Sequence, residues 1–354
     1  MTLNHKRNTM KQILSFLLIC SSFFSCSKNN ASQELKVLQF NIWQEGTVVP
    51  GGYEAIISQI IQSDADFVTL SEVRNYNNTR FCDRIIESLK DSGYTYYSFY
   101  SYDSGLISRY PIIDSTVVFP PQNDEGSAYR ALIDMNGQEV ALYTCHLDYR
   151  HCTYYDIYGY SGVTWEKREP LLDLDSILTD NRLSKRDDAM AAIIKMAEED
   201  RAKNRLVFIG GDYNEPSHLD WTEETKDLYS HQGLVIPWTV SSMLEKANYI
   251  DAYRELYPSA VTHPGFTFPS ANSYVDLSQL LWAEESDERE RVDFIHYTPN
   301  SQLKLQEVII WGPQESIHTS QIVIEKSLDT FRKAPGIWPT DHKGVLATFI
   351  YTQK

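Results

Sequence analysis

The chain has 354 residues, of which 42% are hydrophobic and 12% aromatic, and its formal net charge is −16. This is the composition of a folded globular protein with a large core, and after the N-terminal segment no apolar run reaches the ~18 residues needed to span a membrane. The negative charge disfavours nucleic acid as a ligand, although a local basic groove or bound divalent cations could offset it.

The N-terminus has the pattern of an export signal. Positive side chains precede an apolar stretch, and a cysteine follows the serine-containing segment after it: Lys6, Arg7, Lys11 and Cys26. We predict a lipoprotein-type signal peptide over residues 1–25, Cys26 as the lipid acceptor, and a linker over residues 26–34; a buried first helix is the alternative. Removal of residues 1–25 would lower the formal charge to −19, because three positive residues and no acids are lost.

The mature chain would keep three cysteines, Cys82, Cys145 and Cys152. Three thiols cannot all pair within one chain, and no two of them have the spacing of metal ligands. Cys145 lies in a predicted strand and is expected to be buried. A Cys82–Cys152 disulfide remains open at this stage.

Short strand patterns alternate with turns and a few helical stretches along the chain. Strands are predicted at residues 36–43, 66–73, 105–113 (broken at Pro111), 139–148, 206–210, 291–297 and 345–351. A helix is predicted over residues 53–62, and Ser184 is expected to cap the N-terminus of a longer one. The many strands, few helices and lack of a regular βαβ rhythm predict an α+β fold of packed sheets flanked by helices.

Polar side chains recur at the ends of the predicted strands. They are Asn41, Glu72, His146, Asp148, Asp212, Asn214, Asp293, Asp341 and His342. A single acid at a strand end is most often a turn former, but six such places in one chain predict a common site. Carboxylate and amide oxygens favour Mg²⁺ or Mn²⁺, and no histidine pair has zinc spacing. His146 and His342 adjoin acids, so each is a candidate for stabilising charge or moving a proton.

These residues lie in seven ordered motifs that resemble the endonuclease/exonuclease/phosphatase superfamily. The motifs are LQFNIW (Asn41), FVTLSEVR (Glu72), GLISRYPI (Arg109), YTCHLD (His146), FIGGDYNEP (Asp212, Asn214), RVDFIHY (Asp293) and WPTDHKGVLATF (Asp341, His342). The resemblance covers about residues 35–351. It implies a DNase I-like, four-layered α/β sandwich of two mixed sheets, with the whole of residues 35–354 as one domain.

The same resemblance implies roles for the motif residues. Glu72 would be the principal Mg²⁺ (or Mn²⁺) ligand, supported by Asn41 and Asp341. Asp212 would position or deprotonate the attacking water, and Asn214 would orient the phosphate. His342 with Asp293, and His146, would stabilise the transition state.

Other residues are candidates for substrate binding. Arg109 could contact phosphate, although we favour a structural ion pair for it. Residues 149–183 are expected to form a long aromatic loop without a helix, because Gly159 and Gly162 interrupt it. This loop is either a packed lid or a recognition wall, to which Tyr149 and Arg150 would contribute. Trp221 and His218 follow the Asp212 motif and are expected near the pocket.

The sequence therefore predicts an exported, metal-dependent phosphoesterase that is anchored to a membrane by lipid. Its expected substrate is a phosphodiester or phosphomonoester of a small molecule or lipid headgroup, and no protein partner is predicted. A secreted DNase I-like nuclease is the alternative, disfavoured by the charge and by the lack of a basic aromatic patch. A catalytically silent binding protein on this fold is a third hypothesis, and a weaker one.

Overall fold

The computed structural model describes residues 32–353. The predicted signal peptide and Cys26 lie outside the described residues. The first strand begins at Ser32, so residues 32–34 of the predicted linker already belong to the fold. Within residues 32–353, no helix has both the length and the apolar character needed to cross a membrane.

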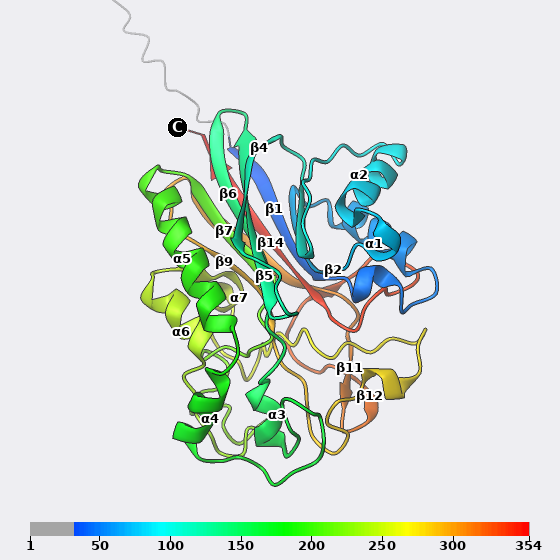
Figure 1. Cartoon of the computed structure of the whole chain (residues 1–354), viewed down its shortest axis with the longest axis vertical. Coiled ribbons are helices and arrows are strands. Elements are labelled where there is room, and N and C mark those ends of the chain that lie inside the picture. The colour runs from blue at the N-terminus through cyan, green and yellow to red at the C-terminus, as the bar shows by residue number, and fades with distance from the viewer. Residues whose placement is uncertain (1–31, 354) are drawn as a thin grey trace, which may run out of the picture.

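Two six-stranded mixed sheets form the centre of the molecule (Figure 1). The first has the order β13–β10–β14–β1–β2–β3, with β1 Ser32–Asn41, β2 Phe67–Val73, β3 Asp103–Ser108, β10 Leu303–Trp311, β13 Phe331–Arg332 and β14 Gly344–Thr352. The second has the order β4–β5–β6–β7–β9–β8, with β4 Ile112–Phe119, β5 Gly126–Met135, β6 Gln138–Leu147, β7 Leu206–Asp212, β8 Ile250–Asp251 and β9 Asp293–Tyr297. A separate hairpin consists of β11 Glu315–His318 and β12 Gln321–Ile324.

Helices cover the outer faces of both sheets, as Figure 1 shows. The helices on the first sheet are α1 Gly52–Ser63 and α2 Phe81–Asp91, and those on the second are α5 Arg186–Ala202 and α6 Thr239–Lys246. The remaining helices are α3 Thr153–Tyr158, α4 Leu174–Asn181 and α7 Ala252–Leu256, with 3₁₀ turns at Gln44–Gly46, Tyr76–Asn78 and Leu277–Leu280. This arrangement of helices, sheet, sheet and helices confirms the predicted four-layered α+β sandwich.

The main core lies between the two sheets. Phe67 on β2, Phe208 on β7 and Phe349 on β14 meet there. The ring centroid of Phe208 lies 6.3 Å from that of Phe67 and 5.2 Å from that of Phe349. The sheets approach closely near the site: a Cβ added at Gly210 would lie 2.3 Å from Thr69 Oγ1. Close packing here fixes the position of β7 relative to β2, and both strands carry site residues at their ends.

Several local predictions need correction. The segment predicted as a loop without a helix contains α3 and α4, because Gly159 (φ 87°) ends α3 rather than preventing it. Ser184 is not the cap of α5: its hydroxyl donates to the Asn181 carbonyl, and Lys185 occupies the N-cap. Among the elements that were not predicted are most of β4, strands β5, β8 and β10 to β13, and helices α2, α6 and α7.

The three described cysteines are free and buried. A Cys82–Cys152 disulfide is therefore not formed, while the expected burial of Cys145 is confirmed. Burial raises the pKa of all three thiols, so they are held protonated. These side chains act as small apolar residues rather than as ligands or nucleophiles.

Candidate active site

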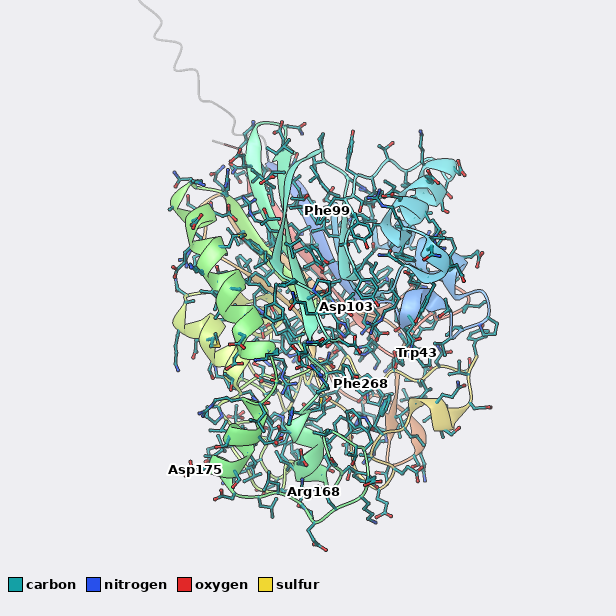
Figure 2. The ribbon with its side chains drawn as sticks, in the orientation of Figure 1. Trp43, Phe99, Asp103, Arg168, Asp175 and Phe268 are labelled. Atoms are coloured by element: carbon teal, nitrogen blue, oxygen red, sulfur yellow. The ribbon has the colours of Figure 1, made fainter. Side chains whose placement is uncertain are left out.

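A pocket of about 310 Å³ opens at one end of both sheets, and most of the motif residues line it. Parallel pairing of β1 with β2, and of β6 with β7, places the ends of these four strands together. Across β7 and β9, Asp212 and Asp293 are directly paired. Figure 2 shows Trp43, Asp103 and Phe268 around this region, between the strands and helix α3. The structure thus brings the predicted catalytic and metal-binding side chains to one place.

A β-bulge turns Glu72 into the pocket. The β2–β3 register shifts between Ser71 and Val73, and Glu72 has a φ of 70°. A non-glycine residue in this left-handed region costs on the order of 1–3 kcal/mol, and such strain persists only where the surroundings enforce it. The bulge therefore holds the Glu72 carboxylate at the site at the expense of regular pairing.

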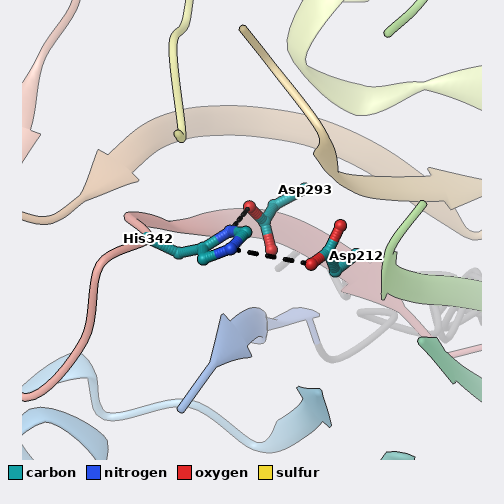
Figure 3. A group of neighbouring side chains, drawn as sticks. All are labelled: Asp212, Asp293 and His342. Carbon is teal, nitrogen blue, oxygen red and sulfur yellow. Dashed lines mark hydrogen bonds and ion pairs between the residues drawn. The ribbon is translucent and has the colours of Figure 1, made fainter. Parts of the chain in front are cut away.

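Asp212, Asp293 and His342 form a compact buried group, shown in Figure 3. His342 Nδ1 lies 2.9 Å from Asp293 Oδ2, and Nε2 lies 3.8 Å from Asp212 Oδ2. Burial disfavours the charged imidazole, but the two carboxylates outweigh it and raise the pKa of His342 to about 10. His342 is thus a cation at neutral pH, with Nε2 directed at Asp212 (Figure 3).

A second histidine–acid pair faces Asp212 from the other side. His146 Nδ1 lies 2.8 Å from Asp103 Oδ1, and His146 Nε2 lies 3.9 Å from Asp212 Oδ2. Burial again opposes the charge, but Asp103 outweighs it and the pKa of His146 rises to about 9. Arg74 donates to the same Asp103 oxygen at 2.8 Å.

Asp103 is the principal site residue that sequence reasoning missed. It has a φ of 68°, begins β3, and lies opposite Val73 beside the bulge. In the sequence Asp103 lies two residues before the predicted strand 105–113 and outside the motif series, so nothing marked it as a site residue. The structure makes it the orienting partner of His146.

Asp212 and Asn214 are held by hydrogen bonds that leave them facing the pocket. The Asn214 amide N–H donates to Asp212 Oδ1 at 2.9 Å, and Asn214 Nδ2 donates to the Leu147 carbonyl at 2.9 Å. Burial, together with the charge of Asp293, raises the pKa of Asp212. This carboxylate therefore binds a proton more readily than an ordinary Asp, as a general base for water requires.

Glu72 and Asp341 offer the oxygen atoms that a hard divalent cation needs. Burial and the charge of Glu72 raise the pKa of Asp341 to about 7, which indicates negative charge that the surrounding protein does not fully balance. A cation between the two carboxylates would supply that balance, so these residues fit a Mg²⁺ or Mn²⁺ ion. The compact group around Asp212 fits less well, because His342 is already protonated there.

Asn41 does not have the orientation of a metal ligand. Its Oδ1 accepts the Trp43 N–H at 2.9 Å, while its Nδ2 donates to Glu72 at 3.2 Å and to Asp212 at 2.9 Å. An N–H group cannot coordinate a cation. In this arrangement Asn41 holds the two carboxylates in place, and its role as a metal ligand stays a prediction.

The substrate-binding candidates divide between pocket and periphery. Tyr149 lines the pocket. Arg150 pairs with Asp148 at 3.0 Å and with Glu125 at 3.2 Å, so its charge is already balanced.

Two of these candidates are corrected by their positions. Arg109 lies away from the pocket and pairs with Asp64 at 2.7 Å, so the structural ion pair is the correct alternative. Trp221 is fully buried against His231 (ring centroids 3.8 Å apart), because a hydrophobic cluster forms behind the pocket wall. His218 lines a different pocket.

Aromatic side chains form the rest of the wall. They are Trp43, Tyr149, Tyr154, Tyr155, Trp165, Phe268 and Trp282. Residues 149–183 were expected to form either a packed lid or a recognition wall. Tyr154 and Tyr155 have features of both, because they belong to a buried cluster and also line the pocket. The contributions of Trp43, Phe268 and Trp282 were not predicted, because their segments meet the pocket only in the folded chain.

Replacing Asp103 with Asn should lower the pKa of His146 from about 9, because a neutral amide no longer stabilises the imidazolium. The native chain binds this proton more tightly than the unfolded chain, in which the pKa is ~6.5. The resulting stabilisation is complete below that pH and is lost as the pH rises through about 9. NMR titration of the imidazole measures the shift. Asp124→Asn is the control, since Asp124 pairs with Arg74; equal pKa values in Asp103→Asn and wild type would contradict the assignment.

Comparison with known proteins agrees with this geometry. A sequence model described as the endonuclease/exonuclease/phosphatase family matches residues 38–342. An uncharacterised protein of Caenorhabditis elegans, F14F9.5, is 27% identical over 293 residues, covering 81% of this chain and 85% of that protein.

Among solved structures, a D. rerio TDP2 complexed with single-strand DNA product is similar, with a TM-score of 0.51 and 16% identity over 90% of this chain and 99% of that one. A humanized D. rerio TDP2 gives the same TM-score at 14% identity, covering 89% and 98%. These likenesses support the fold. With the family match over most of its length, the chain belongs to the endonuclease/exonuclease/phosphatase family, whose members hydrolyse phosphoesters.

Proposed function

We propose that this protein is a divalent-metal-dependent hydrolase of a phosphomonoester or phosphodiester in a small molecule or lipid headgroup. The observation that carries the proposal is the convergence of Asp212 with two cationic histidines at the base of the pocket. A general base placed between two imidazolium groups suits attack by water on an anionic phosphate. The proposed cofactor is Mg²⁺ or Mn²⁺.

The proposed mechanism assigns each side chain one task. Asp212 accepts a proton from the attacking water and directs the oxygen of that water at phosphorus. His342 and His146 present Nε2–H groups to the phosphoryl oxygens, on which charge accumulates in the transition state. Asn214 stays fixed by Leu147 and orients the phosphate. A cation held by Glu72 and Asp341 would stabilise negative charge on the phosphate and the leaving oxygen.

Asp293 and Asp103 act through the histidines rather than on the substrate. Each carboxylate lies against an Nδ1 atom, at 2.9 Å and 2.8 Å respectively. Each therefore fixes the ring orientation, keeps the proton on Nε2 and stabilises the cation. The Asp293 carboxylate is itself held by Gln39, whose Nε2 donates at 3.2 Å.

The charge around the pocket favours a small substrate over a nucleic acid. Arg74, the only arginine or lysine lining the pocket in the described chain, already pairs with Asp103 and Asp124. A polynucleotide needs several free cations along its backbone. The secreted nuclease remains the second candidate, because the D. rerio TDP2 similar in fold is complexed with a DNA product.

Asp212→Ala and His342→Ala should each lower kcat by roughly 10²–10⁴-fold, the usual contribution of a positioned acid or base. Phosphorus NMR of a mixed panel would report both rate and substrate; the panel holds duplex DNA, RNA, phospholipids and phosphorylated small molecules. Arg109→Gln is the matched control, because its ion pair lies outside the pocket, and it should retain wild-type turnover. Wild-type rates in Asp212→Ala would overturn the site, and Asp212-dependent cleavage of nucleic acid alone would support the nuclease.

Chelation should stop the reaction, because Glu72 and Asp341 would otherwise present unbalanced negative charge to the phosphate. EDTA is expected to abolish hydrolysis, and excess Mg²⁺ or Mn²⁺ to restore it. Glu72→Gln should raise the metal concentration that gives half-maximal activity. Full activity in EDTA would exclude the metal-dependent mechanism.

We also propose that the enzyme is exported and anchored by lipid at Cys26, on the basis of the N-terminal sequence pattern. In a bacterial host that processes such signals, the wild-type protein should sediment with membranes, and Cys26→Ser should remain in the soluble fraction. Equal distribution of the two proteins would contradict the anchor without affecting the proposed chemistry.

A further inference from the structure

Four consecutive residues between strand β1 and helix α1 have left-handed backbone angles, and we name them the left-handed turn: Trp43, Gln44, Glu45 and Gly46. Their φ values are 38°, 54°, 62° and 70°. Three of the four carry side chains, for which this region is unfavourable, and L-residues normally adopt it singly. Such conformations persist where the surroundings enforce them, and they gather at functional sites. The turn begins at the active site, where Figure 2 labels Trp43.

The carboxylate of the left-handed turn binds the chain just beyond Glu72. Glu45 Oε1 accepts the backbone N–H of Arg74 at 2.9 Å and that of Asn75 at 2.6 Å. These two residues directly follow the bulge that carries Glu72. Hydrogen bonds to an ionised acceptor are stronger than those between neutral groups. One buried carboxylate oxygen therefore holds the segment through which β2 leaves the bulge.

The same turn also contacts the Glu72 side chain. The backbone N–H of Gln44 donates to Glu72 Oε2 at 2.9 Å, while Asn41 Nδ2 donates to Oε1 at 3.2 Å. The side chain of Gln44 accepts the Tyr76 hydroxyl at 2.8 Å, which adds a further link between the turn and the residues after β2. The Glu72 carboxylate and the backbone that follows it are thus both held by the left-handed turn.

Glu45 reaches the pocket only through its neighbours. Its side chain is buried, and its second oxygen, Oε2, accepts from Arg84 Nη2 at 2.8 Å. Among the described residues that line the active-site pocket, Gln44 and Glu72 are present and Glu45 is not. Any effect of Glu45 on the pocket must therefore act through the position of the chain around Glu72.

We propose that Glu45 is a positioning residue for the metal site, because it fixes the direction of the Glu72 carboxylate. This inference rests on the proposed function, in which Glu72 holds the divalent cation. Groups that orient metal ligands contribute to the affinity for the metal without touching it. Without the Glu45 carboxylate, the N–H groups of Arg74 and Asn75 lose their acceptor. Both the turn and the bulge could then relax toward more favourable backbone angles, and Glu72 would turn away from Asp341.

Metal binding can be measured without substrate, by electron paramagnetic resonance of free Mn²⁺ during a titration of the purified protein. Glu45→Ala should raise the Kd for Mn²⁺ by about 10-fold to 100-fold, the usual effect of losing a group that orients a ligand. Glu45→Gln keeps an oxygen for the two N–H groups and should lose less affinity than Glu45→Ala. Wild-type affinity in Glu45→Ala would overturn the proposal. If Glu45→Ala does not fold, Glu45→Gln decides alone: weaker binding supports the proposal, and unchanged binding overturns it.

Two further variants separate positioning from the simple loss of a negative charge. Glu54→Gln removes an exposed acid of α1 and should bind Mn²⁺ as the wild type does. Arg84→Gln removes the cation that pairs with Glu45, so a purely electrostatic effect would strengthen Mn²⁺ binding, whereas positioning predicts equal or weaker binding. Tighter binding in Arg84→Gln together with weaker binding in Glu45→Ala would attribute the effect to charge alone and overturn the proposal.

Glu72→Gln is the reference that separates failure of this inference from failure of the proposed function. Weak Mn²⁺ binding in Glu72→Gln with wild-type binding in Glu45→Ala would overturn the role of Glu45 alone. Wild-type binding in Glu72→Gln would instead reject the metal site of the proposed function, and the role of Glu45 with it.

Thermal unfolding separates positioning from a merely structural role. A structural role would lower the Tm of Glu45→Ala and leave its Mn²⁺ affinity unchanged, which would overturn the proposal. In Glu45→Ala, excess Mn²⁺ should restore most of the wild-type kcat, because it fills the weakened site. A kcat that stays low in Glu45→Ala at saturating Mn²⁺ would place the effect outside the metal site and overturn the proposal.

Discussion

The buried negative charge at the ends of the strands is the constraint on which the site depends. Asp212, Asp293 and Asp103 are all buried, and burying several carboxylates without partners would be strongly unfavourable. Two imidazolium groups supply most of the compensation, which is why the pKa values of His146 and His342 rise to about 9 and about 10. The acids and histidines therefore stabilise each other's charged forms, and the same arrangement leaves both Nε2 atoms facing Asp212 Oδ2, at 3.9 Å and 3.8 Å.

The fold meets this constraint with rigid elements. Asp212 and Asp293 are neighbours in the β7–β9 ladder, and His146 is paired with Asp212 across β6 and β7. Backbone pairing thus fixes the positions of three residues proposed to be catalytic, independently of their side chains. Glu72 is the exception. In a regular β2 its side chain would point to the face set by the strand alternation, whereas the bulge turns it into the pocket at the cost of local strain.

The sequence predicted the parts of the structure that depend on local pattern. Apolar runs predicted β1, β2, β3 and β14 of the first sheet and β6, β7 and β9 of the second. The motif series correctly predicted that His146, Asp212 and His342 would meet. It did not reveal Asp103, because a partner for His146 is defined by spatial proximity across β3 and β6 rather than by spacing. Arg109 and Trp221 show the same limit: both occur beside motif residues, yet an ion pair and a buried cluster hold them away from the pocket.

The two halves of the pocket have different structural origins, and this separates chemistry from specificity. The catalytic half is built from strand ends whose positions the two sheets determine. The aromatic half is built by residues after β6 and by the segment before β9, which are joined in part by hydrogen bonds from tyrosines of α3 to Glu288 and Glu290. A change in these segments could alter the group that is recognised while Asp212 and its histidines stay in place. Under the proposed function, the substrate would be selected where the chain departs from the sheets and hydrolysed where the sheets end.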